Sequence, residues 1–107
     1  MHKAFSVYAI TRIMNLEKVA GTNTKHDVLI YTLSTCGWCR KTKQLLKELD
    51  IAYAYIDVDL LTGDEVEKAR KELKQYNPRG SYPTMVIDNG KYVIVGFKDD
   101  EIRGVLS

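Results

Sequence analysis

Residues 28–49 read VLIYTLSTCGWCRKTKQLLKEL. The first six, residues 28–33, form an apolar run that is typical of a buried strand, and residues 40–49 carry leucines at helical spacing. The stretch therefore predicts a strand that turns directly into an amphipathic helix. Cys36 and Cys39, which are the only cysteines of the chain, lie at that turn.

The position of the two cysteines favours reversible thiol–disulfide chemistry. The first turn of a helix presents unpaired backbone N–H groups and the positive end of the peptide dipoles, and a thiol placed there is stabilised as thiolate. We therefore predict that Cys36 is the nucleophile. Cys39 follows one helical turn later on the same face, and we predict that it resolves a mixed disulfide formed on Cys36.

Other interpretations of the cysteine pair are less consistent with the sequence. A zinc site needs four ligands, and the two histidines, His2 and His26, lack zinc-ligand spacing, so no metal site is predicted. A purely structural disulfide would close a very short loop and constrain the unfolded chain little. An iron–sulfur cluster bridging two chains stays open as an alternative, because cluster irons take cysteine thiolates as ligands.

Length, charge and composition indicate one small domain. The chain has 107 residues, of which 45% are hydrophobic, and a net charge of +2 without the basic stripe of a nucleic-acid-binding protein. It shows no apolar run long enough to span a membrane and no signal peptide, and two cysteines at a reactive spacing fit a reducing compartment. We expect a cytoplasmic monomer that binds neither nucleic acid nor membranes and holds no cofactor.

The chain after the first helix continues as strand, helix, hairpin and helix. Residues 52–58 are rich in aromatic and β-branched residues, which predicts a second strand parallel to the first. Residues 62–65 have the form of a capping box, Thr-x-x-Glu, and Asn77-Pro78 ends the helix that follows. Asp57 and Asp59 are predicted to be solvated turn residues.

The last third of the chain predicts an antiparallel pair and a short helix. Residues 85–87 and 92–95 flank Asn89-Gly90, a type I′ hairpin signal, and acidic residues open a helix at Asp99. The predicted order is βαβαββα, a four-stranded mixed sheet flanked by helices.

Residues 1–27 are harder to interpret. Residues 4–10 fit a strand or part of a helix, and residues 21–25 are linker-like. We treat residues 1–27 as an N-terminal extension, in part disordered, and residues 28–107 as the redox domain.

The chain resembles the glutaredoxin and thioredoxin superfamily in three features. These are the order of its elements, the Cys36-x-x-Cys39 pair at the first strand–helix junction, and the proline in Ser81-Tyr82-Pro83-Thr84. The chain is most similar to glutaredoxin-like redoxins, because Gly96-Phe97-Lys98-Asp99-Asp100 lies where glutaredoxins carry Gly-Gly-x-Asp-Asp. The resemblance implies a thioredoxin-like fold and covers residues 28–107.

The resemblance also implies roles for residues outside the cysteine pair. Pro83 would be the family's cis-proline facing Cys36, with the backbone of Tyr82 offered to an extended substrate. Arg79 matches a basic position that contacts glutathione, and Asp99 or Asp100 would complete such a site. Trp38, between the two cysteines, is predicted to contact a docking partner.

Two departures from the glutaredoxin pattern concern the glutathione site. Leu33 stands where glutaredoxins commonly carry a lysine, and Phe97 replaces the second glycine after Gly96, as in redoxins that thioredoxin reductase reduces. We therefore predict a dithiol–disulfide oxidoreductase that reduces disulfide-containing proteins, with ribonucleotide reductase as one candidate, and that a thioredoxin reductase-like enzyme recycles. The alternatives are a glutathione-dependent glutaredoxin and the iron–sulfur carrier.

Overall fold

The computed structural model describes residues 16–107, and the possible strand or helix at residues 4–10 lies outside this range. The elements are, in chain order, β1 (Glu17–Val19), β2 (Val28–Thr32), α2 (Gly37–Glu48), β3 (Tyr53–Asp57), η1 (Val58–Leu60), α3 (Asp64–Tyr76), β4 (Thr84–Ile87), η2 (Asp88–Gly90), β5 (Tyr92–Val95) and α4 (Asp99–Leu106). The predicted succession of strands and helices from residue 28 onward is confirmed. No helix in the described part of the chain is long and apolar enough to cross a membrane.

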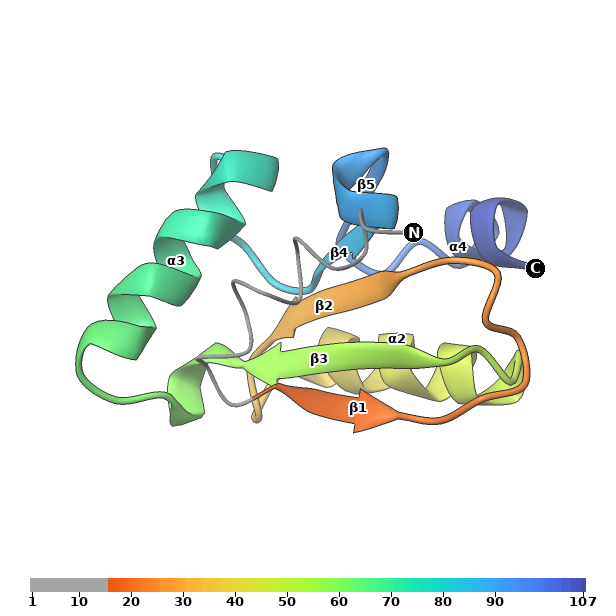
Figure 1. The fold of residues 1–107 in the computed structure, drawn as a ribbon, viewed down its shortest axis with the longest axis horizontal. Helices are drawn as coiled ribbons and strands as arrows, with labels where there is room; N and C mark the ends of the chain where they lie inside the picture. Colours follow the sequence, from red (N-terminus) through yellow and green to blue (C-terminus); the bar gives the residue numbers. More distant parts are fainter. Residues whose placement is uncertain (1–15) are drawn as a thin grey trace.

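The strands form one mixed sheet in the order β1-β3-β2-β4-β5 (Figure 1). β2 runs parallel to β3, and the other neighbours are antiparallel. The prediction of four strands is therefore wrong by one, because β1 adds a fifth at the edge. Its residues are mostly exposed and carry no alternating apolar pattern, so backbone pairing with β3, Val19 opposite Tyr53, holds it in the sheet.

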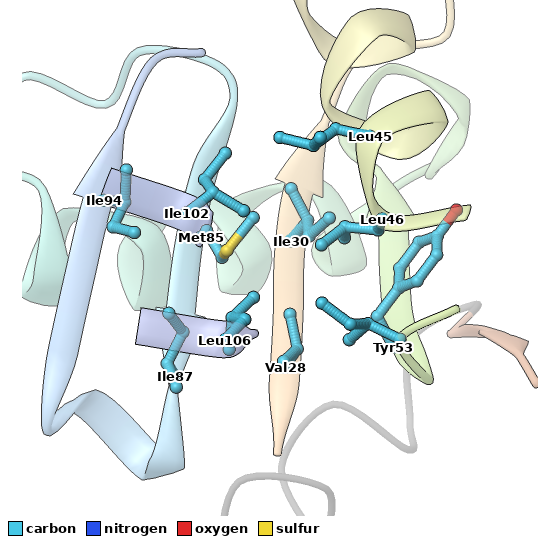
Figure 2. Packing of buried hydrophobic residues seen from close by; sticks show 11 residues of the cluster. Val28, Ile30, Leu45, Leu46, Tyr53, Met85, Ile87, Ile94, Ile102 and Leu106 are labelled. Atoms are coloured by element: carbon cyan, nitrogen blue, oxygen red, sulfur yellow. The ribbon is translucent and has the colours of Figure 1, made fainter. Parts of the chain in front are cut away.

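Side chains on β2 alternate between two hydrophobic layers, as expected for a strand buried on both faces. On one face, Val28 and Ile30 pack with residues from α2 and α4, including Leu46 and Ile102 (Figure 2). On the other face, Leu29 and Tyr31 pack beneath α3 with a second set: Ala54, Ile56, Val58, Leu61, Ala69, Leu73 and Val86. The sheet is thus a rigid platform whose central strand points at the cysteine pair.

The hairpin between β4 and β5 is confirmed, and its turn has the predicted type I′ form: Asn89 and Gly90 both have positive φ, at 61° and 101°, and the N–H of Lys91 donates a hydrogen bond to the carbonyl of Asp88 at 3.2 Å. Ile87 pairs with Tyr92, so residues 88–91 form the connection. Asp88 also has positive φ, at 53°. Asp88 is held there because its carboxylate accepts a hydrogen bond from the backbone N–H of Asp27 at 3.0 Å.

The capping box predicted at residues 62–65 is not formed. Gly63, with φ of 61°, is the N-cap of α3, and no side chain caps the helix. The backbone carbonyl of Thr62 instead accepts a hydrogen bond from the N–H of Glu65 at 3.2 Å. α3 ends at Tyr76, immediately before Asn77-Pro78, as the sequence predicts.

Candidate active site

Cys36 lies at the junction of β2 and α2, where the sequence places it. It is the N-cap of α2, with extended backbone angles (φ −87°, ψ 118°), and its side chain is half-buried. The sulfur accepts a hydrogen bond from the backbone N–H of Cys39 at 3.1 Å. The Cys36 Sγ atom therefore sits where the unpaired N–H groups of the first helical turn converge.

Cys39 differs from Cys36 in its exposure, although both are free thiols. Its side chain is 1% exposed. Burial, reinforced by the hydrogen bond with Cys36, raises the pKa of the Cys39 thiol to about 12. Cys39 is therefore protonated at neutral pH and shielded from bulk solvent, whereas Cys36 is reachable.

The loop before β4 carries Tyr82 and Pro83. The Tyr82–Pro83 peptide bond is cis, as the family resemblance implies. The carbonyl of Pro83 accepts a hydrogen bond from the N–H of Gly96 at 2.8 Å, which ties this loop to the segment after β5. Within residues 16–107, the backbone N–H and C=O of Tyr82 make no hydrogen bond, so both groups are available to a ligand.

The buried side-chain amide of Asn77, a residue predicted only to end a helix, holds this loop in place. Asn77 is 4% exposed. Its Nδ2 donates hydrogen bonds to Ser81 Oγ at 3.0 Å and to Thr84 Oγ1 at 2.9 Å. Its Oδ1 accepts one from the backbone N–H of Arg79 at 3.2 Å. The pairing of Asn with Pro in the sequence indicated a helix end but not this network.

A basic groove of about 420 Å³ runs beside Tyr82. The predicted residues Arg79, Tyr82 and Leu33 all line it, together with Arg70 and Lys74 from α3 and one acidic residue, Asp59, so basic side chains outnumber acidic ones by three to one. Arg70 and Lys74 were not predicted as site residues, although their spacing of four residues places them on one face of a helix. The groove can therefore accept a negatively charged group next to the backbone of Tyr82.

Trp38 and Phe97 form an aromatic shelf close to Cys36. Their rings stack with centroids 6.0 Å apart and an interplanar angle of 21°, and Trp38 is 60% exposed. Lys41 Nζ lies 5.5 Å from the centroid of the Trp38 ring. Asp99 lines a hollow with Phe97 and Lys41, and its carboxylate accepts a hydrogen bond from Arg103.

The prediction that Asp57 is a solvated turn residue is wrong. Its carboxylate accepts a hydrogen bond from Thr32 Oγ1 at 2.6 Å and lies 3.6 Å from Lys43 Nζ. Asp59 is exposed, as predicted, and accepts a hydrogen bond from the backbone N–H of Ser34 at 2.8 Å. Hydrogen bonds from the Ser34 hydroxyl and N–H lower the pKa of Asp59 below its usual value.

In the described range, no group of three or more His, Cys, Asp or Glu side chains is arranged to hold a metal ion.

Comparisons with known proteins converge on one family. A family model described as glutaredoxin matches residues 28–93. Glutaredoxin 1 of Rickettsia conorii is 38% identical over 64 residues, which cover 60% of each chain. An uncharacterised glutaredoxin-like 8.6 kDa protein in the rubredoxin operon of Clostridium pasteurianum is 36% identical over 75 residues, covering 70% of this chain and 91% of that protein.

Two solved structures from Methanosarcina species superpose well on this chain. A glutaredoxin from Methanosarcina mazei Go1 has a TM-score of 0.77 and 44% identity, covering 86% of this chain and 87% of its own. A methanoredoxin from Methanosarcina acetivorans has a TM-score of 0.74 and 42% identity, covering 78% and 87% respectively. The residues matched by the family model, 28–93, include the cysteine pair, the loop before β4 and the strands β2, β3 and β4.

Proposed function

Because the chain belongs to the glutaredoxin family, we propose that it is a dithiol–disulfide oxidoreductase that reduces protein disulfides. The observation that carries the proposal is the pairing of a reachable thiol at a helix N-terminus, Cys36, with a buried protonated thiol one turn later, Cys39. Because the two thiols differ in exposure and protonation, Cys36 acts as the nucleophile and Cys39 as the resolving thiol.

The reaction proceeds in two exchange steps. Cys36 attacks a substrate disulfide as thiolate, a mixed disulfide forms, and one substrate sulfur leaves as a thiol. Cys39 then attacks Cys36, the Cys36–Cys39 bond forms, and the second substrate sulfur leaves. The substrate gains two electrons and the dithiol loses two, so an external reductant must regenerate the pair.

Single-cysteine variants test these roles. Cys39→Ser keeps the nucleophile but removes the resolving thiol, so it accumulates a covalent adduct with the substrate on Cys36. Cys36→Ser abolishes turnover. The proposal is rejected if Cys36→Ser keeps full activity while Cys39→Ser forms no adduct, as read by intact mass and by turnover of a disulfide substrate.

Substrate docking uses the surfaces on both sides of Cys36. The free backbone groups of Tyr82 pair with an extended substrate segment, and Pro83 presents them toward the cysteine. The exposed face of Trp38, backed by Phe97, supplies apolar contact. Gly96 and Asp99 shape the end of this surface.

We further propose that a thioredoxin reductase-like enzyme, rather than glutathione, regenerates the dithiol in the cytoplasm. Leu33 lines the groove where a lysine would bind a glutathione carboxylate, and the Phe97 ring fills space next to Trp38. Turnover with thioredoxin reductase is compared with turnover with glutathione plus glutathione reductase. Efficient coupling to glutathione alone would reject this choice of reductant.

One observation favours glutathione as the reductant instead. Arg70, Lys74 and Arg79 gather in the groove beside Tyr82 and replace the missing lysine as partners for a carboxylate. If this second candidate is right, Arg70→Gln raises the KM for glutathione several-fold. With a reductase as the physiological partner, the same substitution leaves reductase-coupled turnover of an uncharged disulfide unchanged.

A further inference from the structure

Lys43, four residues after Cys39 on α2, forms an ion pair with Asp57 at the end of β3. Neither residue has a role in the two exchange steps described above. Lys43 and Asp57 are only 23% and 16% exposed, and Lys43 Nζ lies 3.6 Å from Asp57 Oδ1. The same ammonium lies 3.7 Å from the centroid of the Tyr55 ring. A lysine held by a carboxylate and an aromatic face has lost most of its freedom, which is unusual for a surface cation.

Asp57, which holds Lys43, is itself held by Thr32 on β2, the strand that leads to Cys36. Asp57 pairs in register with Thr32 across β2 and β3. The Thr32 hydroxyl is fully buried and donates a hydrogen bond to Asp57 Oδ1 at 2.6 Å. The carboxylate that fixes Lys43 is thus tied to the strand whose end leads to Cys36.

Helix geometry places Lys43 and Cys39 on the same face of α2, one turn apart. Lys43 follows Cys39 by four residues in α2, so both lie on one helix face with Cβ atoms roughly 5–6 Å apart. Helical side chains also lean toward the N-terminus, which brings the ammonium back toward Cys39. Consistent with this, the charge of Lys43 lowers the pKa of Cys39, against the larger effect of burial.

The Lys43 ammonium has N–H groups that are free to donate hydrogen bonds. A lysine has three N–H donors, and no side-chain hydrogen bond from Lys43 is formed to any residue in the range 16–107; its contact with Asp57 is an ion pair at 3.6 Å. Besides Lys43, the titratable groups that interact electrostatically with Cys39 are Cys36 and Tyr82, and Asp57 partly compensates the charge of Lys43. Neither Cys36 nor Tyr82 can supply positive charge, whereas Lys43 can.

The resolving step creates a negative charge that a nearby cation would stabilise. Cys39 must lose its proton to attack Cys36, yet it lies in a buried site that disfavours a thiolate. During the step, the Cys39–Cys36 bond forms, the bond from Cys36 to the substrate sulfur breaks, and the departing sulfur takes the electron pair. A proton leaves Cys39 and a proton joins the released sulfur, so protons and electrons balance.

We propose that Lys43, positioned by Asp57, Thr32 and Tyr55, stabilises the negative charge that develops on Cys39 and thereby sets the rate of resolution. The inference rests on the proposed function, because it concerns the second of its two steps. Lys43 has no part in the first step, in which Cys39 keeps its proton.

The experiment separates the two steps in time. Reduced wild type, Lys43→Gln, Lys43→Arg and Lys47→Gln are mixed rapidly with the symmetrical disulfide of a short capped peptide that carries no charge. Acid-quenched samples from pH 6 to 9.5 are analysed by intact mass, which follows formation and loss of the mixed disulfide. Lys47 is the matched control, because it is an exposed lysine at the far end of α2.

Lys43→Gln is expected to form the mixed disulfide at the wild-type rate and to resolve it about three- to tenfold more slowly at pH 7. Its pH–rate profile for resolution moves up by roughly half to one pH unit, the size expected for loss of one nearby, partly compensated charge. Lys43→Arg restores resolution to within about twofold of wild type, and Lys47→Gln behaves as wild type.

Other outcomes overturn the inference. If Lys43→Gln lowers the thermal midpoint but leaves the resolution profile in place, the lysine has a structural role only. If it slows both steps equally, its effect is a general disturbance of the site. If wild type and Cys39→Ser both fail to form any adduct, the proposed function fails, and that result is distinct from normal adduct formation with an unchanged resolution rate.

Discussion

Replacing Asn77 with alanine should destabilise the protein and loosen the substrate-binding loop together. The side chain is 4% exposed and joins the end of α3 to the residues that lead into β4. It donates hydrogen bonds to Ser81 Oγ and Thr84 Oγ1 at 3.0 and 2.9 Å and accepts one from Arg79 N–H at 3.2 Å. Asn77→Ala removes these three and a longer fourth bond from Nδ2 to the Ser81 carbonyl at 3.4 Å, while the backbone hydrogen bonds of residue 77 remain possible.

The size of the effect follows from the number of bonds. Each contributes about 0.5–1.5 kcal/mol net, so the free energy of unfolding should fall by about 2–4 kcal/mol. A loss of that size corresponds to a fall in Tm of roughly 8–25 °C in a domain of this length. Urea unfolding followed by circular dichroism should show a lower midpoint with an unchanged m-value.

Ser81→Ala is the matched control, because it removes a single one of these hydrogen bonds from an exposed residue. It should cost about 0.5–1 kcal/mol. Asn77→Ala should also raise the KM for a protein disulfide, since the loop that carries Arg79 and Tyr82 is less ordered. An Asn77→Ala protein as stable as Ser81→Ala would refute the role assigned to the amide.

Three further predictions concern the hydrophobic core, the loss of folding stability at alkaline pH, and the aromatic shelf formed by Trp38 and Phe97. Leu46→Ala removes a fully buried side chain between α2 and the sheet and should cost about 2–5 kcal/mol in urea unfolding; a cost below 1 kcal/mol would contradict the packing. The folded-state pKa of Cys39 is raised from 9.0 to about 12, so the stability that this thiol contributes below pH 9 should be lost as pH rises from about 9 to 12. Under reducing conditions, Cys39→Ala should show a flatter decline over that window, and equal slopes would count against a buried neutral thiol. Trp38→Ala should change stability by less than about 0.5 kcal/mol, because the ring is 60% exposed, while the KM for a protein disulfide rises and that for a small disulfide does not; equal effects on both substrates would argue against partner contact.

The parts of the fold that could be predicted are those with strong local patterns. The apolar run of β2, the leucine face of α2 and the Asn77-Pro78 stop each imply one local structure. β1 could not be predicted in this way, because Glu17, Lys18 and Val19 carry no strand pattern and pair only because β3 offers a free edge. The Asn89-Gly90 turn was also predictable, whereas the positive φ of Asp88 was not, because contacts of its carboxylate with residues far away in the sequence hold it there.

In the candidate site, too, residues with a local sequence pattern were predictable and residues that depend on distant contacts were not. Cys36 and Cys39 are recognisable from their spacing and from the strand and helix beside them. The environment of Asp57 depends on Thr32 and Lys43, which lie 25 and 14 positions earlier in the chain. Their contacts with Asp57 arise only when β2, β3 and α2 are packed, so an aspartate at a strand end gave no sign of a half-buried ion pair.

The most direct test of the account is the rate at which each cysteine of the reduced protein is alkylated at pH 7. Iodoacetamide is added in excess, and peptide mass spectrometry follows modification at Cys36 and Cys39 separately over time. The account predicts rapid modification of Cys36, with Cys39 protected by its burial and its retained proton until the protein unfolds in urea. Modification of Cys39 at the same rate, or a Cys36 as inert as an unactivated buried thiol, would contradict the assignment of nucleophile and resolving thiol.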